Sequence, residues 1–207
     1  MSEAGRVYTG RSAAERDADR RQRLLTAGRD LFGSEGYVAT SVERLCSAAN
    51  VSTRHFYLLF SNKEDCFLAV YDDVTGTSLA SAVESLADTA GSPMRERVAR
   101  AFLAYVQPFL ADPGAARITF VESIVVGASS ETHREVFRAA LVSTVETESS
   151  AAVARGEIAD RDFRLAALAL IGAAGTIISD WARSTEAYSL ADLEAELVTI
   201  ALKLLTE

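Results

Sequence analysis

The feature that most constrains this chain is the stretch 41–60, where two brief helical patterns are separated by a three-residue break. Apolar residues before the break recur at spacings of three and four, which predicts one buried stripe on a short helix. In the break, Asn50 tolerates the left-handed backbone of a tight turn, and Ser52 offers a hydroxyl that caps a following helix. The stretch therefore predicts two short helices joined by a tight turn.

The rest of the chain also reads as helix. Apolar residues recur with helical period, no segment alternates as a strand does, and only 3 Pro and 12 Gly interrupt the pattern. We expect about nine helices, at about 16–34, 41–49, 53–60, from 61 onward, 93–106, 113–126, 131–155, 162–183 and 189–205. Thr40, Ser61 and Ser92 are the expected caps of the second, fourth and fifth helices.

The charge of the chain is unevenly distributed. The net charge of −8 by itself argues against a nucleic-acid partner, yet residues 1–66 hold 10 Lys and Arg against 9 Asp and Glu, and residues 67–207 hold 11 against 20. Because local charge on one face governs nucleic-acid binding, the acidic total does not exclude it. Six arginines precede the core of the first helix, and for the first two a solvated tail explains the pattern as well as DNA contact: Arg6, Arg11, Arg16, Arg20, Arg21 and Arg23.

The sequence shows no secretion signal and no obvious membrane span. Residues 1–19 are polar and charged, and the longest apolar run, 165–178, has 14 residues where a span needs roughly 20. The two cysteines, Cys46 and Cys66, are too few for a disulfide framework or a zinc site. We therefore expect a cytoplasmic protein without a membrane partner, metal or cofactor.

Catalytic motifs are also absent from the sequence. It has no glycine-rich phosphate loop, no Gly-x-Ser-x-Gly elbow and no metal-spaced His or Cys pair. Its two histidines, His55 and His133, are far apart in sequence. The sequence thus argues against an enzyme.

Three short motifs follow one another in residues 20–70. An opening helix ends in Leu31-Phe32 and is followed by Gly36-Tyr37, then comes the helix and turn from Thr40 to Ser52, and then Phe56-Tyr57-Leu58-Leu59-Phe60 with Lys63-Glu64. In content and order this segment resembles the TetR family of transcriptional regulators. The resemblance implies an all-α protein, with an N-terminal three-helix helix-turn-helix domain and a larger C-terminal helical domain that binds ligand and dimerises. The expected division is a flexible basic arm at 1–17, a DNA-binding domain at 18–78 with its motif at 41–60, and the second domain at 79–207.

The resemblance also implies roles for individual residues of the motif. In a helix-turn-helix the second helix places its N-terminal side chains against base edges in the major groove. The expected base contacts are Thr53, Arg54 and His55; the expected phosphate contacts are Thr40, Ser52, Tyr57 and Lys63; and Ser41 completes the DNA-binding set. Capping and packing alone remain an alternative for Thr53 and Tyr57. Two positions depart from the family pattern, because Asn50 stands where glycine is usual and Leu59 where histidine is usual.

The remaining two-thirds of the chain is expected to sense a small apolar or amphipathic effector and to form a homodimer. The apolar run 165–178 and the stripe of the last helix predict a four-helix bundle across a two-fold axis, with an intrachain core helix as the alternative. Bulky residues of the middle helices suit a ligand pocket, although core packing explains each of them equally well: Phe102, Tyr105, Phe109, Phe120, Ile124, Phe137, Leu141 and Trp181. Glu122, Thr176 and Asp180 are candidate polar lining, whereas His133 is expected at the surface.

The function that these patterns favour is a repressor that leaves its operator when the effector binds. The fourth helix joins the two expected domains and is the expected lever between them. Two alternatives stay open from the sequence: a protein-interaction module with a degenerate helix-turn-helix, and an activator of the same fold.

Overall fold

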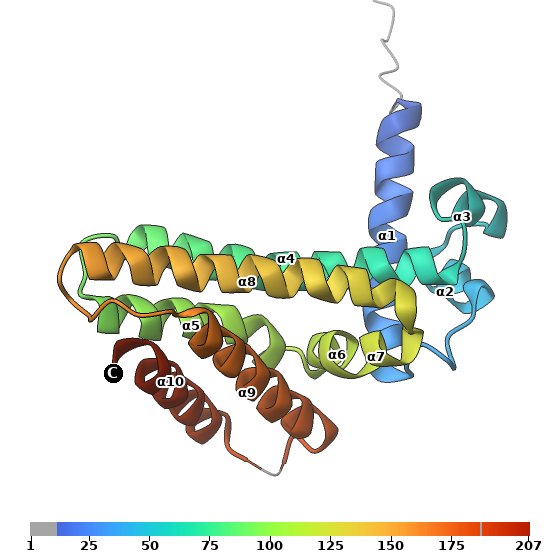
Figure 1. Cartoon of the computed structure of the whole chain (residues 1–207). Helices are drawn as coiled ribbons and strands as arrows, with labels where there is room; N and C mark the ends of the chain where they lie inside the picture. Colours follow the sequence, from blue (N-terminus) through green and yellow to red (C-terminus); the bar gives the residue numbers. More distant parts are fainter. Residues whose placement is uncertain (1–11, 187) are drawn as a thin grey trace, which may run out of the picture.

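The computed structural model describes residues 12–186 and 188–207, and every regular element in that part of the chain is helical (Figure 1). The elements are α1 (Ala13–Ser34), α2 (Val42–Ala49), α3 (Thr53–Leu59), α4 (Lys63–Asp88), α5 (Met94–Leu110), α6 (Pro113–Arg117), η1 (Ile118–Glu122), α7 (Ser123–Val126), α8 (Ala128–Ala154), α9 (Arg164–Arg183) and α10 (Leu190–Thr206). η1 is a π-helical turn, and the run from α6 to α7 replaces the one helix expected at 113–126. With that run taken as a single interrupted helix, the expected count of nine is confirmed for the described residues.

The N-terminal domain is built from α1, α2 and α3 packed against the start of α4. Its centre is aromatic: Phe32, Phe56 and Phe67 are fully buried, and the Phe32 and Phe67 rings lie 5.2 Å apart, edge to face. The turn between α2 and α3 has the predicted geometry, since Asn50 has φ 50° and ψ 50°. The helix-turn-helix expected from sequence is confirmed.

The second helix begins with a different cap from the one expected. Ser41, not Thr40, is the N-cap, and the Ser41 hydroxyl accepts a hydrogen bond from the Arg44 backbone N–H. The Thr40 hydroxyl is buried and donates to the Gly36 carbonyl at 2.8 Å. Thr40 therefore stabilises the turn before the helix instead of the helix itself.

Two later helices also start one residue beyond the expected cap. Asn62, not Ser61, caps α4 by accepting from the Asp65 backbone N–H at 2.8 Å. Pro93, not Ser92, occupies the N-cap position of α5 and makes no side-chain cap bond. At α4 the expected cap is shifted by one residue because Asn62, next to Ser61, offers a competing side-chain acceptor.

The first helix begins earlier than expected. Ser12 and Glu15 form a complete capping box, so α1 starts at Ala13 and not near Arg16. The part of the expected basic arm from 13 to 17 is therefore helical. Residues 1–11, including Arg6 and Arg11, lie outside the described residues.

The C-terminal domain is organised around the long helix α4. Helix α4 runs from the N-terminal domain along the molecule, with α8 beside it and α5 beneath, and α9 and α10 form a further layer (Figure 1). Pro108 lies inside α5, which continues to Leu110 instead of ending near 106. α6 to α7 sit where the second domain meets α1.

Helix α9 is the most apolar helix of this domain. It has 20 residues, so its length and composition alone would allow it to cross a membrane. The helix is six residues longer than the 14-residue apolar run 165–178 noted in the sequence. It packs against α6, η1, α8 and α10. Only 33% of its most apolar window is buried within the chain, and several of the remaining residues border a cavity.

The apolar stripe of the last helix is mostly used within the protomer. Leu193, Leu197, Ala201 and Leu205 are buried where α10 packs on α5, whereas Leu190 is 47% exposed. The expectation that this whole stripe faces a second subunit is therefore wrong for its buried half. The intrachain core explains those four residues.

Candidate nucleic-acid interface and ligand cavity

Helix α3 is a short helix held on one side and open on the other. Phe56 and Phe60 are buried, their rings lie 5.6 Å apart, and the Arg21 guanidinium lies 5.5 Å from the Phe60 ring centre. Tyr57 is 55% exposed and Leu58 is 71% exposed on the opposite side. The sequence predicted the two anchoring aromatics, and α3 projects from the end of the molecule beside α1 (Figure 1).

The three expected base contacts lie together at the start of α3. Ser52 caps the helix by accepting from the His55 backbone N–H at 3.3 Å, and its Oγ lies 2.7 Å from His55 Nδ1. Thr53 and Arg54 are exposed. Within residues 12–186 and 188–207, Arg54 has no hydrogen bond or ion pair, so its guanidinium is available for bidentate bonding to a guanine edge.

The expected phosphate contacts differ in how far their side chains are exposed to solvent. Ser52 and Tyr57 are exposed and Ser41 is half-buried. Thr40 is only 1% exposed, and its hydroxyl is committed to Gly36, so its side chain does not reach a phosphate in this structure. The other expected phosphate contacts are compatible with surface binding.

Lys63 is a structural residue as well as an expected contact. Its ammonium donates to the carbonyls of Tyr37 at 2.8 Å and Thr40 at 2.9 Å, and it lies 4.1 Å from the Tyr37 ring centre. Burial lowers the pKa of the Lys63 ammonium. Two of its three donors are thus used inside the protein, and one remains for a phosphate.

Arg23 is a functional residue that the sequence did not single out for this role. Its Nη1 donates to the carbonyls of Ala49 and Asn50, both at 2.9 Å, and its Nε contacts Asp19 at 3.1 Å. These bonds fasten the turn between α2 and α3 to the side of α1. These partners are separated from Arg23 by 26 and 27 positions, and no pattern in the sequence indicates hydrogen bonds over such separations.

The two leucines at the end of α3 lie in different surroundings, because Leu59 packs on the core and Leu58 is exposed. Leu59 is half-buried and packs on the core, so the residue that replaces the family's usual histidine serves packing. Leu58 is instead exposed, with no polar atom in its side chain. It offers an apolar surface of the kind that contacts thymine methyl groups and sugars, and the sequence analysis missed it.

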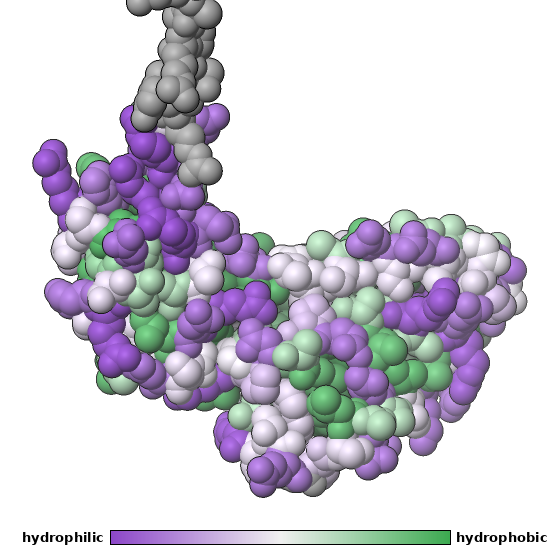
Figure 2. Space-filling view, turned by 180° about the vertical axis from the view of Figure 1, so that it is seen from behind, coloured by the Kyte–Doolittle hydropathy of each residue, from purple (hydrophilic) through white to green (hydrophobic). Residues whose placement is uncertain are grey.

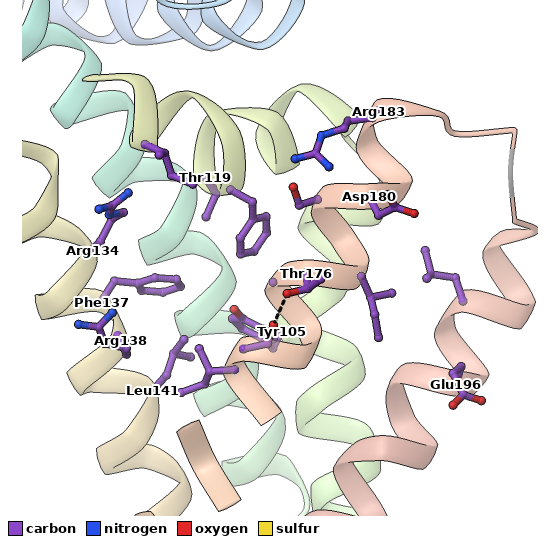
Figure 3. Close-up of a pocket in the computed structure, with 18 of the residues that line it drawn as sticks. Tyr105, Thr119, Arg134, Phe137, Arg138, Leu141, Thr176, Asp180, Arg183 and Glu196 are labelled. Atoms are coloured by element: carbon purple, nitrogen blue, oxygen red, sulfur yellow. Dashed lines mark hydrogen bonds between the residues drawn. The ribbon is translucent and has the colours of Figure 1, made fainter. Parts of the chain in front are cut away.

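The C-terminal domain contains an open cavity of about 1030 Å³ between α4, α5, η1, α8, α9 and α10 (Figure 3). Its apolar lining includes Tyr105, Phe120, Phe137 and Leu141. Tyr71 and Tyr105 also line it, and burial raises the pKa of both phenols. Burial therefore favours the neutral form of both phenols.

Charged side chains line opposite walls of this cavity. Arg134 and Arg138 come from α8 on one wall, and Arg183 lies near Asp180 at the end of α9 on the other (Figure 3). Thr119 lies between these walls at the end nearest the N-terminal domain, and the carboxylates of Asp192 and Glu196 come from α10. Arg134 is paired with Glu131, and Arg138 lies 3.8 Å from Glu135. The charged residues around His133 suggested a surface segment, and for that reason Arg134 and Arg138 were not among the expected cavity residues.

A second cavity of about 80 Å³ lies between α4, α5, α8, α9 and α10. The two cavities share Tyr105, Leu141 and Ile171 in their walls. Most other residues of the second wall are aliphatic: Leu79, Leu86, Met94, Val98, Val145, Leu170 and Leu205. The two cavities are therefore neighbours with a common wall, and the wall of the second is largely apolar.

Most of the expected ligand residues line one of the two cavities. Phe102, Tyr105, Phe120, Ile124, Phe137 and Leu141 do so, as do Thr176 and Asp180. Phe109 and Trp181 do not line either cavity and are fully or almost fully buried, so the structure places them in the core. Glu122 is buried on the opposite side of η1, where its carboxylate accepts a hydrogen bond from the Tyr37 backbone N–H.

His133 lies at the surface, as expected. Its Nδ1 is 2.7 Å from the Asp72 carboxylate, and its side chain is 34% exposed. This contact joins α8 to α4 in a shallow surface cleft. The structure describes no group of three or more His, Cys, Asp or Glu side chains suited to a metal ion in residues 12–186 and 188–207.

The chain is similar in sequence to curated transcriptional regulators. Residues 24–70, which contain α2 and α3, match the family described as bacterial regulatory proteins, tetR family. The uncharacterized HTH-type transcriptional regulator YhgD of Bacillus subtilis is 27% identical over 168 residues, which is 79% of this chain and 84% of YhgD. A second, YerO of the same organism, is 28% identical over 78 residues, which is 38% of this chain and only 27% of YerO.

Solved structures share the fold along nearly the whole chain. The fatty acid degradation regulator FadR of Bacillus halodurans has a TM-score of 0.78 at 18% identity, covering 90% of this chain and 94% of its own. FadR of Bacillus subtilis, solved in complex with stearoyl-CoA, has a TM-score of 0.78 at 19% identity, with coverage of 89% and 97%. A regulatory protein of the tetR family from Rhodococcus has a TM-score of 0.72 at 20% identity, with coverage of 90% and 96%. Residues 24–70 therefore carry the tetR-family match, and the chain as a whole shares the fold of solved tetR-family regulators.

Proposed function

We propose that this regulator is a cytoplasmic repressor that binds operator DNA as a homodimer and is released from it by a small amphipathic molecule. The observation that carries the proposal is the presentation of α3. Its polar N-terminal residues are exposed while Phe56 and Phe60 hold the helix from behind. A short, capped, outward-facing helix is what insertion into a major groove requires.

Within this proposal the DNA-binding domain covers 18–78 and the sensing domain 79–207. Thr53, Arg54 and His55 read bases, and Ser41, Ser52, Tyr57 and Lys63 bind phosphates. The domain boundary falls inside α4, which is continuous from Lys63 to Asp88. The two domains are thus joined through a rigid element without a flexible linker.

The dimer surface in this proposal is the part of α9 and α10 that the protomer leaves uncovered. Leu165 at the start of α9 is 73% exposed, and two-thirds of the most apolar window of α9 is not buried within the chain. Figure 2 shows apolar residues gathered on the C-terminal domain, whereas the end that carries α1 is covered mostly by hydrophilic residues. An exposed apolar patch of this kind marks a site of association.

The cavity supports an amphipathic effector. An aliphatic chain fits the apolar walls that the two cavities share, and an anionic head group suits the α8 wall, where Arg134 and Arg138 line the first cavity. The similarly folded FadR of Bacillus subtilis was solved with stearoyl-CoA, which combines a long aliphatic chain with anionic phosphates. We therefore propose a long-chain acyl thioester as the effector class to test first.

The test of DNA recognition starts from a library of random duplexes. Repeated rounds of binding to the purified full-length chain should enrich an inverted repeat whose half-sites lie one helical turn apart, about 34–36 Å. Enrichment of a single half-site would contradict the dimer, and the absence of any enriched sequence would contradict specific DNA binding.

The effector is tested on the selected complex. Stearoyl-CoA is added, and release of the duplex at micromolar concentration is the expected result. No release at saturating stearoyl-CoA would reject this effector class.

A further inference from the structure

Helix α3 turns one side away from the core that anchors it. Phe56 and Phe60 are buried, and at about 100° per residue these two side chains project toward nearly the same side of the helix. Arg54 and Leu58 each lie two positions before one of these anchors, so each projects about 160° away from it. Leu58 is 71% exposed, and Arg54 is exposed as well. The side of α3 opposite the anchors therefore presents one arginine and one leucine, one helical turn apart.

The side chains that flank this pair are partly taken up by contacts within the domain. His55 is half-buried, and its Nδ1 lies 2.7 Å from Ser52 Oγ. Leu59 is also half-buried and packs on the core. Most of the Leu58 side chain, in contrast, is open to solvent. A duplex that lies against the open side of α3 therefore has Leu58 within reach.

A leucine on this side of α3 has only one kind of group to recognise on a base edge. Single exposed leucines are common on protein surfaces, so the exposure of Leu58 decides nothing without its position beside Arg54. The leucine side chain has no hydrogen-bonding atom, so it cannot read the donors and acceptors that bases present in the major groove. The apolar group on these edges is the C5-methyl group of thymine. Contact between the two removes apolar surface of both from water, which favours binding.

The spacing along the helix limits how far apart the two contacted bases lie. The four residues from Arg54 to Leu58 correspond to a rise of about 6 Å, whereas stacked base pairs are about 3.4 Å apart. The Arg54 guanidinium has no hydrogen bond or ion pair among residues 12–186 and 188–207, so it is available for the two acceptors of a guanine. A guanine bound by Arg54 and a thymine bound by Leu58 therefore lie within about two base pairs of each other.

We propose that Leu58 is a base-reading residue that recognises the C5-methyl group of a thymine within about two base pairs of the guanine bound by Arg54. The inference rests on the proposed function, because it requires α3 to lie in the major groove. It adds a requirement that the proposed function does not contain, namely a thymine methyl group in each half-site. Since 5-methylcytosine carries a methyl group on the same ring carbon, binding also becomes sensitive to cytosine methylation at that position.

The experiment removes the two partners of this contact separately. On the DNA, each thymine of the duplex selected from the random library is replaced in turn, in both half-sites at once, by deoxyuridine, which lacks only the methyl group. On the protein, Leu58→Ala shortens the side chain in the full-length chain. Val136→Ala is the matched control, because Val136 is 67% exposed on α8 in the other domain. Affinities are measured by fluorescence anisotropy at one salt concentration, since phosphate contacts make them salt-dependent.

We expect one such replacement to lower the affinity of the wild-type chain by about three- to tenfold per half-site, the loss that corresponds to one buried methyl group. Leu58→Ala should bind the thymine duplex more weakly than wild type does. The same replacement should then cost this variant less than about twofold, because the partner of the methyl group is already gone. Val136→Ala should respond as wild type does. The sensitive thymine should lie within about two base pairs of the guanine at which Arg54→Ala loses its preference.

Three results would overturn the inference. A replacement that costs wild type and Leu58→Ala equally would mean that another residue reads the methyl group. An equal loss of affinity of Leu58→Ala for the selected duplex and for a shuffled duplex of the same composition would mean that Leu58 contacts sugars. At the sensitive position, 5-methylcytosine should bind wild type about threefold or more tightly than cytosine does, and equal binding of the two would also contradict the contact.

The outcome for Leu58 is separable from the outcome for DNA binding as a whole. A wild-type chain that selects a duplex without any methyl-sensitive thymine would overturn this inference and leave the DNA-binding proposal standing. Failure to select any duplex would overturn both. Equal midpoints of thermal unfolding in the three proteins exclude loss of the fold as the cause of weaker binding. If Leu58→Ala does not fold, Leu58→Gln, which keeps a long side chain, must show the same loss of methyl discrimination.

Discussion

The two ends of this molecule are packed in opposite ways. Around α3 the aromatic side chains of the core are buried and contact one another directly, as Phe56 and Phe60 do at 5.6 Å. In the C-terminal domain the aromatics of α5 and α8 instead surround a cavity of about 1030 Å³, with Tyr105 and Phe137 6.5 Å apart across its wall. A DNA reader must hold one shape, whereas a sensor must leave room for its ligand. The contrast predicts different responses to similar substitutions.

The largest expected difference comes from truncating one phenylalanine in each region. Phe56→Ala should lower the free energy of unfolding by about 3–5 kcal/mol, because Phe56 is fully buried and its removal leaves a hole in a packed core. Phe137→Ala should cost only about 1–2 kcal/mol, because the half-buried Phe137 ring already borders empty space. Urea denaturation of both variants measures the difference. Equal losses of unfolding free energy would show that the C-terminal domain is packed as tightly as the DNA-binding domain.

A buried ion pair in the sensing domain gives the next largest effect. Arg97 is 7% exposed, and its Nε donates to the Glu148 carboxylate at 2.7 Å. Arg97→Met should cost about 3 kcal/mol, at the low end for a broken buried pair because Arg155 still lies 3.2 Å from Glu148. Arg100→Met, which removes an exposed pair on the same helix, should stay within about 0.5 kcal/mol.

The same pair predicts a pH dependence. Burial raises the pKa of the Glu148 carboxyl, but the hydrogen bonds and charges of Arg97 and Arg155 outweigh burial, so the pKa lies below its ordinary value of 4.5. A carboxyl with a lowered pKa in the folded protein contributes stability above its unfolded pKa and loses it as the pH falls through the folded one. The advantage of wild type over Arg97→Met should thus be constant above about pH 5 and shrink below about pH 4.5. A constant difference down to pH 3 would contradict this role of Glu148.

A substitution on the surface of α3 should affect binding and leave stability unchanged. Arg54→Ala is expected to weaken binding to the selected operator by about 10- to 100-fold and to relax the preference at one base pair, because a bidentate guanine contact is lost. Arg95→Ala, an exposed arginine on α5 in the other domain, should leave operator affinity unchanged. Fluorescence anisotropy titrations compare the two. An Arg54→Ala protein with wild-type affinity and preference would remove Arg54 from the reading surface.

The smallest effect is expected where a buried hydroxyl has no partner. Thr119→Val should change the free energy of unfolding by less than about 0.5 kcal/mol, since no hydrogen bond of the described chain is lost. Thr75→Val should cost about 0.5–1.5 kcal/mol, because the buried Thr75 hydroxyl donates to the Tyr71 carbonyl at 2.8 Å. Thermal unfolding of the pair is the measurement. A larger loss for Thr119→Val than for Thr75→Val would mean that Thr119 serves the fold and not a ligand.

The parts of this structure that local chemistry controls could be predicted from the sequence. Asn50 indicated a left-handed turn, Phe56 and Phe60 indicated the buried side of α3, and Gly156 follows the end of α8 with φ +74°. Where two side chains that can cap a helix are adjacent, as at Thr40 and Ser41, the predicted first residue of the helix was off by one position. These features depend on neighbours within a few positions, which a sequence displays directly.

The parts that depend on distant contacts could not be predicted. The bond between Glu122 and the Tyr37 amide joins residues 85 positions apart, and the one between Arg23 and Asn50 spans 27. Neither pairing leaves a periodic trace in the sequence. Phe109 and Phe120 likewise have the same side chain, but only the fold decides that the first fills the core and the second borders the cavity.

The central claim is that α3 reads DNA sequence from the outside of a closely packed domain, and a salt-dependent titration tests it most directly. The purified chain is titrated onto the selected duplex and onto a shuffled duplex of equal length and composition, between 50 and 200 mM salt. The account predicts that the selected duplex binds at least about 1,000-fold more tightly and that both affinities fall steeply with salt, as phosphate contacts release counterions. Equal affinity for the two duplexes, or an affinity that does not change with salt, would contradict it.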